Sequence, residues 1–276
     1  MTERDRTRAE ALKTEGNACF QKGKWSAAAE RYTEALTLCP DWAVLLVNRA
    51  QCHRKQREWR QQESDCRRAL KIDGKSMKGH YFLGIALFEQ TNLSEAVQHL
   101  TQALDLARES GDSIRDQVWH ELGKAKYASW ENRAAQRQTE HRQLQQRLQQ
   151  MLQAKQAAES SGTQGAAWGE MRQQHSHEAS LLSRVFAEVG CEDEAGSVAG
   201  PFTCQLTMEP FREPVITPSG LSYERSALLD HLNKVGHFDP VTRQKMAPSD
   251  IRLNVGLRAA TQQYLDEHGW AWKETF

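Results

Sequence analysis

Small side chains recur at a fixed spacing of about 34 residues through residues 9–106 of this chain. Two positions of the period hold only glycine or alanine: Gly16, Ala50 and Gly84 at one, and Ala35, Ala69 and Ala103 at the other. Such positions are typical of two antiparallel helices that pack too closely to admit larger side chains. One helix pair cannot bury its apolar face alone, so successive pairs must stack. The spacing therefore predicts a helical solenoid.

The period is that of tetratricopeptide (TPR) repeats. Three repeats, the first ended by Pro40 and the second by Gly74, predict six helices. We expect a seventh helix to cover the last repeat, because the end of a solenoid must be capped. One position departs from the pattern, since Gln62 stands where the other two repeats carry Ala28 and Ala96.

Lysine, asparagine and aromatic residues gather on the first helix of each repeat, and these helices are expected to line the concave face. The candidates are Lys13, Asn17, Asn48, Lys55, Lys78, Tyr81 and Phe82. Lys13 and Asn17 are four residues apart and therefore share one helical face. Lysines attract carboxylates and asparagines bond a peptide backbone, so the set fits an extended acidic C-terminus. For any one lysine taken alone, the alternative is a solvated helix surface.

The middle of the chain reads as a helical hairpin. Residues 113–158 contain no proline and only one glycine, which predicts one long helix. Ser160–Gly165 break it, and a second amphipathic run follows. The apolar residues of that run are Trp168, Met171, Leu182, Val185, Phe186 and Val189, with His175 among them. This stripe favours either self-association or packing within the hairpin, and the pattern does not choose between them.

The C-terminal part predicts a small α+β module. Residues 215–217 and 221–223 flank Pro218-Ser219-Gly220, which suits a type I turn between two strands. Glu224–Lys234 is predicted as a helix ended by Gly236, and Leu253–Leu265 as a final helix. Residues 201–276 contain one cysteine and three histidines, so zinc pairs cannot be assembled at the required spacing. We expect neither a metal nor another cofactor.

Composition narrows the classes of binding partner and the cellular compartments that this chain fits. The 36 basic and 36 acidic residues balance, which favours neither nucleic acid nor a membrane as a partner. The charged start of the chain does not have the apolar core of a signal peptide. Six cysteines without Cys-x-x-Cys spacing indicate free thiols in a reducing compartment. We expect a cytoplasmic location, with the nucleus left open as a second one.

Two strings in the C-terminal module, PVITPSG at residues 214–220 and GHFDPVTR at 236–243, resemble the U-box, a zinc-free relative of the RING ubiquitin-ligase domain. The resemblance implies a groove for a ubiquitin-conjugating enzyme (E2), formed by Leu206, Met208 and Pro240. It also implies that Arg243 bridges the E2 and its attached ubiquitin. Ubiquitin transfer by this class of ligase needs no covalent intermediate on the ligase.

The order of repeats, hairpin and U-box resembles the co-chaperone ubiquitin ligases. Their carboxylate clamp grips the Glu-Glu-Val-Asp tail of the 70- and 90-kilodalton cytosolic heat-shock chaperones, and misfolded clients of those chaperones receive the ubiquitin. The resemblance further implies a homodimer. The sequence does not decide whether the aspartate of the family's clamp is present. That aspartate aligns near Gln117, and Asp116 is adjacent, so it is either shifted by one residue or missing.

The sequence therefore predicts a mainly α protein in four segments. These are 1–112, TPR repeats with the clamp; 113–190, a capping helix and helical hairpin; 191–200, a linker; and 201–276, the U-box. The predicted function is that of a co-chaperone E3 ubiquitin ligase. The alternative is a non-enzymatic chaperone adaptor with an inactive U-box-like module, and the clamp set argues against a general repeat scaffold.

Overall fold

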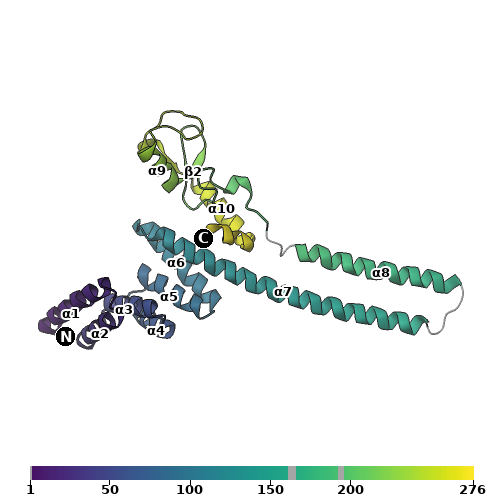
Figure 1. The fold of residues 1–276 in the computed structure, drawn as a ribbon, viewed down its shortest axis with the longest axis horizontal. Coiled ribbons are helices and arrows are strands. Elements are labelled where there is room, and N and C mark those ends of the chain that lie inside the picture. Colours follow the sequence, from purple (N-terminus) through teal and green to yellow (C-terminus); the bar gives the residue numbers. More distant parts are fainter. Residues whose placement is uncertain (1, 161–165, 192–195) are drawn as a thin grey trace. The chain divides into compact units, whose positions relative to one another are not determined.

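The computed structural model describes residues 2–160, 166–191 and 196–276, and its helices follow one another along the chain in Figure 1. The repeat helices are α1 (Glu3–Gln21), α2 (Trp25–Leu38), α3 (Ala43–Gln56), α4 (Trp59–Ile72), α5 (Met77–Glu89) and α6 (Leu93–Ser110). They are followed by α7 (Arg115–Ser160) and α8 (Ala166–Cys191). The mainly helical fold predicted for this part of the chain is confirmed.

Close packing within the helix pairs explains the recurring spacing of small side chains. A Cβ added to Gly16 in α1 would lie 2.6 Å from the ring of Tyr32 in α2. A Cβ added to Gly84 in α5 would lie 2.6 Å from Leu100 in α6. Both neighbours are buried, so neither can move aside without opening the interior. The small residues therefore recur because the two helices of each pair lie too close together for larger side chains.

Gln62, the polar exception among the small residues, has a structural role. Its side chain is fully buried, and its Nε2 donates to the backbone oxygen of Phe82 at 2.6 Å. That bond ties α4 to α5, across the boundary between the second and third repeats. The bond satisfies the donor end of this buried amide, whereas its Oε1 has no hydrogen-bond partner among the described residues.

A buried ion pair fixes α3 against α4. The guanidinium of Arg49 grips Asp65 with two hydrogen bonds, Nε to Oδ2 at 2.7 Å and the second nitrogen to Oδ1 at 2.6 Å. A further nitrogen of Arg49 donates to Thr33 in α2 at 3.0 Å. Bidentate pairing restricts rotation as well as distance. The neighbouring residue Asn48 therefore projects from a firmly held helix.

Helices α7 and α8 run antiparallel as the predicted hairpin. Two contacts show the antiparallel pairing. Glu159 of α7 bonds His175 of α8 at 2.7 Å, and one turn earlier in α7 Lys155 lies 3.7 Å from Glu178, which is three residues later in α8. An apolar stripe follows these contacts and is formed by Leu148, Met151, Leu152, Leu181, Leu182 and Val185. Residues 161–165 of the predicted break and 192–195 of the predicted linker lie outside the described residues, as do the side chains of Trp168, Met171 and Val189.

The C-terminal module is built on a small antiparallel sheet. Its strands are β1 (Pro214–Ile216), β2 (Ser222–Glu224) and β3 (Arg252–Leu253), in the order β2-β1-β3. The helices are α9 (Arg225–Lys234) and α10 (Val255–Glu267), with short 3-10 segments at Gly200–Phe202, Pro248–Asp250 and Gly269–Thr275. The core consists of Cys204, Phe211, Val215, Tyr223, Leu228, Leu232 and Met246. The α+β character predicted for this module is confirmed.

The predicted turn at Pro218-Ser219-Gly220 forms, with the Gly220 amide donating to the oxygen of Thr217 at 2.9 Å. Two predicted helix starts were wrong. Leu253 was assigned to a helix, but it pairs with Val215 in β3, and Asn254 then caps α10 by accepting from the Leu257 amide at 3.0 Å. Glu224 was also assigned to a helix, but it pairs with Pro214 in β2. A strand as short as β3 carries too little alternation to be read from sequence.

Within the described part of the chain, no helix combines the length and the apolar content needed to cross a bilayer.

Candidate functional site

Two asparagines of the predicted clamp meet on the first helices of successive repeats. The Oδ1 of Asn17 in α1 accepts from the Nδ2 of Asn48 in α3 at 3.4 Å. The same oxygen accepts from the hydroxyl of Tyr32 at 2.8 Å, which anchors Asn17 to the repeat interior. One amide hydrogen of Asn48 and the Nδ2 hydrogens of Asn17 are left for a ligand. The geometry brings together two residues that are far apart in sequence.

Two of the three clamp lysines lie beside aromatic rings. The Nζ of Lys13 is 4.8 Å from the centroid of Trp42, and the Nζ of Lys55 is 5.7 Å from that of Trp25. Lys78, in the first turn of α5, is exposed. Among the described contacts, no carboxylate pairs with any of the three. A ring attracts a cation without neutralising it, so these charges are available to an anionic ligand.

Tyr81 and Phe82 are placed differently from the other clamp residues. Their exposed fractions are only 4% and 5%, and their ring centroids are 5.3 Å apart. Arg54 of α3 lies over both rings, with its Cζ 5.6 Å from Tyr81 and 5.8 Å from Phe82. Burial raises the pKa of Tyr81, while the charge of Arg54 acts in the opposite direction. The two rings therefore support Arg54 rather than present a bare apolar surface.

Arg54 was not singled out from the sequence. It precedes Lys55, and adjacent residues of a helix point about 100° apart. The predicted clamp face was chosen to include Lys55, so Arg54 was left out of it. Burial does not decide whether Asp116 supplies the aspartate of the clamp or whether that aspartate is missing, with Gln117 at the aligned position. Asp116 and Gln117 both lie in the first turn of α7, and both are exposed.

The C-terminal module carries two loops of the same design, Cys204–Glu209 and Asp239–Gln244. In each, the amide of the first residue donates to the oxygen of the last, at 2.9 Å and 2.8 Å. In each, the amide of the fifth residue donates back to the oxygen of the first. The side chain at the first position accepts from a backbone amide two residues on. A thiol and a carboxylate thus have equivalent positions in the two loops.

Strand β2 holds both loops from adjacent residues. The amide of Glu224 donates to the Sγ of Cys204 at 3.2 Å, and the hydroxyl of Tyr223 donates to Oδ1 of Asp239 at 2.9 Å. Burial raises the pKa of Tyr223, and its bond to Asp239 acts in the same direction. Strand β2 therefore fixes the position of one loop relative to the other.

Asp239 is the most heavily bonded side chain of the module. Its Oδ2 accepts from the hydroxyls of Thr217 at 3.0 Å and Ser219 at 2.7 Å. Its Oδ1 accepts from Tyr223 and from the amides of Val241 and Thr242, each at 2.9 Å. Burial favours the neutral form of Asp239, but these hydrogen bonds outweigh it and hold the pKa well below its usual range.

The predicted E2-binding residues project from these two loops. Met208 is 77% exposed and Leu206 is 38% exposed, while Pro240 is half-buried. Val241, which the sequence did not single out, is 55% exposed beside Pro240. Val235 and Val255 of the same module are also more than half exposed, so the position of these residues on the two loops, and not exposure alone, fits a docking surface.

Met208 and Arg243 share an unusual backbone conformation. Each is the fifth residue of its loop, and their φ angles are 59° and 61°, in the left-handed region that residues with a side chain seldom adopt. The guanidinium of Arg243 lies 4.9 Å from the ring centroid of Phe238. The loop hydrogen bonds thus hold both side chains outward in a conformation that neither would choose alone.

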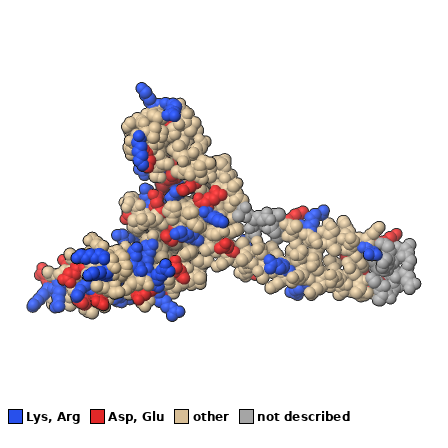
Figure 2. Space-filling model, in the orientation of Figure 1, with Lys and Arg blue, Asp and Glu red and all other residues tan. Residues whose placement is uncertain are grey.

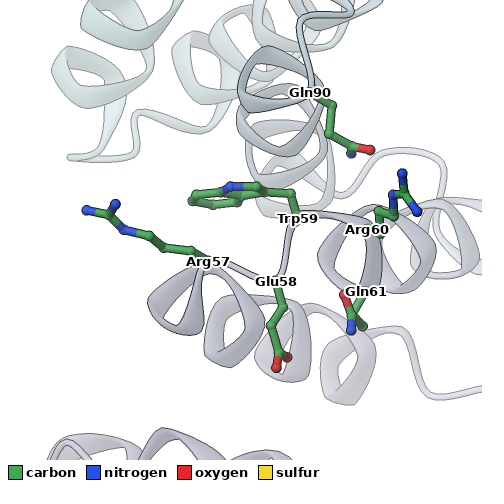
Figure 3. Close-up of a pocket in the computed structure, with 6 residues that line it drawn as sticks. All are labelled: Arg57, Glu58, Trp59, Arg60, Gln61 and Gln90. Carbon is green, nitrogen blue, oxygen red and sulfur yellow. The ribbon is translucent and has the colours of Figure 1, made fainter.

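A shallow pocket of ≈ 450 Å³ lies at the turn between α3 and α4 and is lined by Arg57, Glu58, Trp59, Arg60, Gln61 and Gln90. Figure 3 shows Arg57 and Arg60 on opposite sides of Trp59, so the two cations do not converge. Glu58 is turned to His53, with Oε2 2.6 Å from the ring Nδ1. This arrangement does not form an anion site.

Known protein families match both the N-terminal and the C-terminal part of the chain. The U-box domain family matches residues 198–270, and the tetratricopeptide repeat family matches residues 9–42. E3 ubiquitin-protein ligase CHIP of Arabidopsis thaliana is 40% identical over 267 residues, 96% of this chain and 96% of that one. Small glutamine-rich tetratricopeptide repeat-containing protein 2 of Saccharomyces cerevisiae is 30% identical over 121 residues, 44% of this chain and 34% of that one.

Solved structures match the repeats. The first TPR of Spaghetti (RPAP3), bound to the HSP90 peptide SRMEEVD, is 29% identical and covers 45% of this chain and 94% of its own, with a TM-score of 0.41.

The family matches and the two-loop module define the class of the protein, a U-box E3 ubiquitin ligase that also carries TPR repeats. Because its similarity to the Arabidopsis ligase extends over nearly the whole of both chains, this chain belongs to the CHIP family. The resemblance drawn from the two sequence strings and the repeats is confirmed. Ligase activity, rather than a non-enzymatic adaptor, follows from this membership.

We expect Asp239→Asn to destabilise the U-box by about 2–3 kcal/mol at neutral pH, because hydrogen bonds to a charged acceptor are lost or weakened. The folded pKa of Asp239 is depressed, so its stabilisation is present above the unfolded pKa of about 4 and is lost as the pH falls below it. Burial raises the pKa of Glu224, which opposes this trend.

The measurement is hydrogen exchange of β2 and α9 peptides between pH 3 and 7. Exchange protection should fall on acidification more steeply in the wild type than in Asp239→Asn. Asp230→Asn is the matched control, since Asp230 is exposed and pairs with Lys234 at 2.8 Å on the same helix. Equal protection of Asp239→Asn and the control at neutral pH would show that the carboxylate does not organise the loops.

Proposed function

We propose that this protein is a co-chaperone ligase that binds the acidic C-terminal tail of the 70- and 90-kilodalton cytosolic heat-shock chaperones. The observation that carries the proposal is the contact between Asn17 and Asn48 beside the half-buried Lys13. Paired amides suit an extended peptide backbone, and a cation that no described carboxylate neutralises suits a terminal carboxylate. Lys55 and Lys78 add positive charge, and Tyr81 and Phe82 support the same surface.

The U-box contribution is to orient the reactants. In the proposed reaction, a lysine amine of a misfolded client attacks the thioester carbonyl of the E2–ubiquitin conjugate, and the E2 cysteine leaves as the thiol. The exposed Leu206 and Met208, together with Pro240, form the E2-binding surface. Arg243 bridges the E2 and ubiquitin, because a guanidinium offers several donors in a rigid fork. Holding the thioester in a reactive pose accelerates transfer without a covalent intermediate on this chain.

We further propose a cytoplasmic homodimer formed through the α7–α8 hairpin. Met151 and Val185 are 67% and 53% exposed on its apolar stripe. Figure 2 shows few charged side chains along the hairpin on the visible face. A second copy of the same stripe is the simplest cover for such a surface, since two-fold interfaces are self-complementary.

We expect Lys13→Ala to weaken binding of a Glu-Glu-Val-Asp peptide by more than about tenfold, because one charge-assisted bond is lost. Binding should also weaken as salt rises. Isothermal calorimetry measures both effects, with Lys22→Ala as the control, since Lys22 is exposed at the end of the same helix. An unchanged affinity for Lys13→Ala would refute the clamp.

We expect Arg243→Ala to slow discharge of ubiquitin from the E2 thioester more than it weakens E2 binding. The bridge matters most in the reactive pose, so its loss acts on the transition state. Single-turnover discharge onto free lysine measures the first effect, and E2 affinity is determined in parallel. Leu206→Ala should do the reverse and damage docking.

Lys245→Ala is the control for Arg243→Ala, because it removes an exposed positive charge two residues further along. Discharge by Arg243→Ala at the wild-type rate would rule out the bridging role. If the wild type stimulates no discharge with any E2 in a panel, the U-box is inactive and the adaptor function replaces the ligase.

We expect the double substitution Leu182→Glu and Phe186→Glu to shift the protein from two chains to one, because carboxylates would be buried in an apolar interface. Light scattering measures the mass, and circular dichroism checks that helix content is kept. Gln173→Glu with Ser176→Glu is the matched control at exposed positions of α8. A wild-type protein that is monomeric at micromolar concentration would contradict the proposal.

A further inference from the structure

The indole ring of Trp42, a residue outside the predicted clamp, lies beside the clamp lysine Lys13. The Nζ of Lys13 is 4.8 Å from the ring centroid, within the range at which the face of a ring attracts a cation. Both side chains are half-buried. Tryptophan attracts a cation more strongly than the other aromatic side chains do. The ring therefore restricts the lysine side chain and leaves its positive charge in place.

The backbone of Trp42 is fixed to the start of α3. Its oxygen accepts from the amides of Leu45 at 3.0 Å and Leu46 at 3.4 Å, which are bonds of the first helical turn. The side chains of both leucines are fully buried, so this turn cannot shift without disturbing the close-packed interior. The ring of Trp42 thus extends from a firmly held helix end.

The contact between Lys13 and Trp42 joins the same two elements as the contact between the clamp asparagines. Lys13 and Asn17 lie one turn apart on α1, while Trp42 precedes α3 and Asn48 lies within it. A free lysine side chain samples many rotamers and loses this freedom when a ligand binds. The ring removes part of that freedom before binding, and it keeps the ammonium on the helical face that Asn17 occupies.

We propose that Trp42 is a positioning residue for tail binding, which acts by holding the ammonium of Lys13 toward the terminal carboxylate of the bound peptide. The N–H donors of the ammonium that point away from the ring remain for this carboxylate. The attraction between the two charges is kept, because a ring does not neutralise a cation. The inference rests on the proposed tail-binding function and deepens it.

The test measures the affinity of the full-length chain for a peptide that ends in Glu-Glu-Val-Asp. Calorimetry is run at high peptide concentration for the weaker variants. Trp42→Leu should weaken binding about three- to tenfold, the scale expected when one side chain is no longer restrained. Trp42→Phe should bind with an affinity between those of Trp42→Leu and the wild type, because a phenyl ring attracts a cation less strongly than an indole does.

Trp59→Leu is the matched control. It removes another half-buried tryptophan of the repeats, which Figure 3 shows beside Arg57 at the turn after α3. Its affinity for the peptide should equal that of the wild type. Circular dichroism and thermal melting verify that all variants keep the repeat fold.

A double-mutant cycle with Lys13→Ala separates positioning from other roles of the ring. If Trp42 acts through Lys13, Trp42→Leu should cost little further affinity in a chain that already carries Lys13→Ala. A general loss of structure would instead weaken binding by the same factor in both chains. Direct contact between the ring and the peptide would also do so.

The outcomes distinguish the inference from the function on which it rests. An affinity of Trp42→Leu equal to that of the wild type overturns the role of Trp42 while tail binding stands. An equal loss with and without Lys13, or an equal loss in Trp59→Leu, also overturns it. If the wild type does not bind the peptide, or if Lys13→Ala binds it as the wild type does, the proposed clamp itself fails, and the inference fails with it.

Discussion

A single buried carboxylate organises the U-box. Asp239 gathers three hydroxyls and two backbone amides, and through Tyr223 it ties its loop to the strand that also holds the Cys204 loop. A charged acceptor can satisfy this many donors at once because each bond favours the ionised form. Arg243, which has a left-handed backbone, lies in the loop that Asp239 holds, and Met208 has the same backbone conformation in the Cys204 loop.

The two proposed binding surfaces share one way of presenting positive charge. Lys13, Lys55, Arg54 and Arg243 each lie within 4.8 to 5.8 Å of an aromatic ring centroid. A ring fixes the direction of a long flexible side chain and so reduces the entropy lost when a ligand binds. It does so without the neutralisation that a carboxylate partner would bring. Both the peptide tail and the E2–ubiquitin conjugate would thus meet cations that are already oriented.

Polar contacts join the repeat helices in addition to their apolar packing. Arg49 and Asp65 lock α3 to α4, and Gln62 joins α4 to the backbone of α5. These bonds lie directly behind Asn48 and Phe82. The helices that carry Asn17 and Asn48 are linked through α2, because Tyr32 donates to Asn17 and Arg49 donates to Thr33. These bonds maintain the spacing that the proposed tail binding requires.

The sequence by itself determined the repeat architecture, the helical hairpin and the family of the C-terminal module. These features depend on periodicity, turn residues and short strings, which are local properties. It also selected Lys13, Asn17, Asn48 and Arg243 as candidates. Only the tertiary structure decided which side chains meet. Strand β3 exists because Leu253 pairs with Val215, and Arg54 lies over Tyr81 and Phe82 of another helix. Contacts between elements distant in the chain leave no periodic signal, and residue spacing alone therefore could not reveal them.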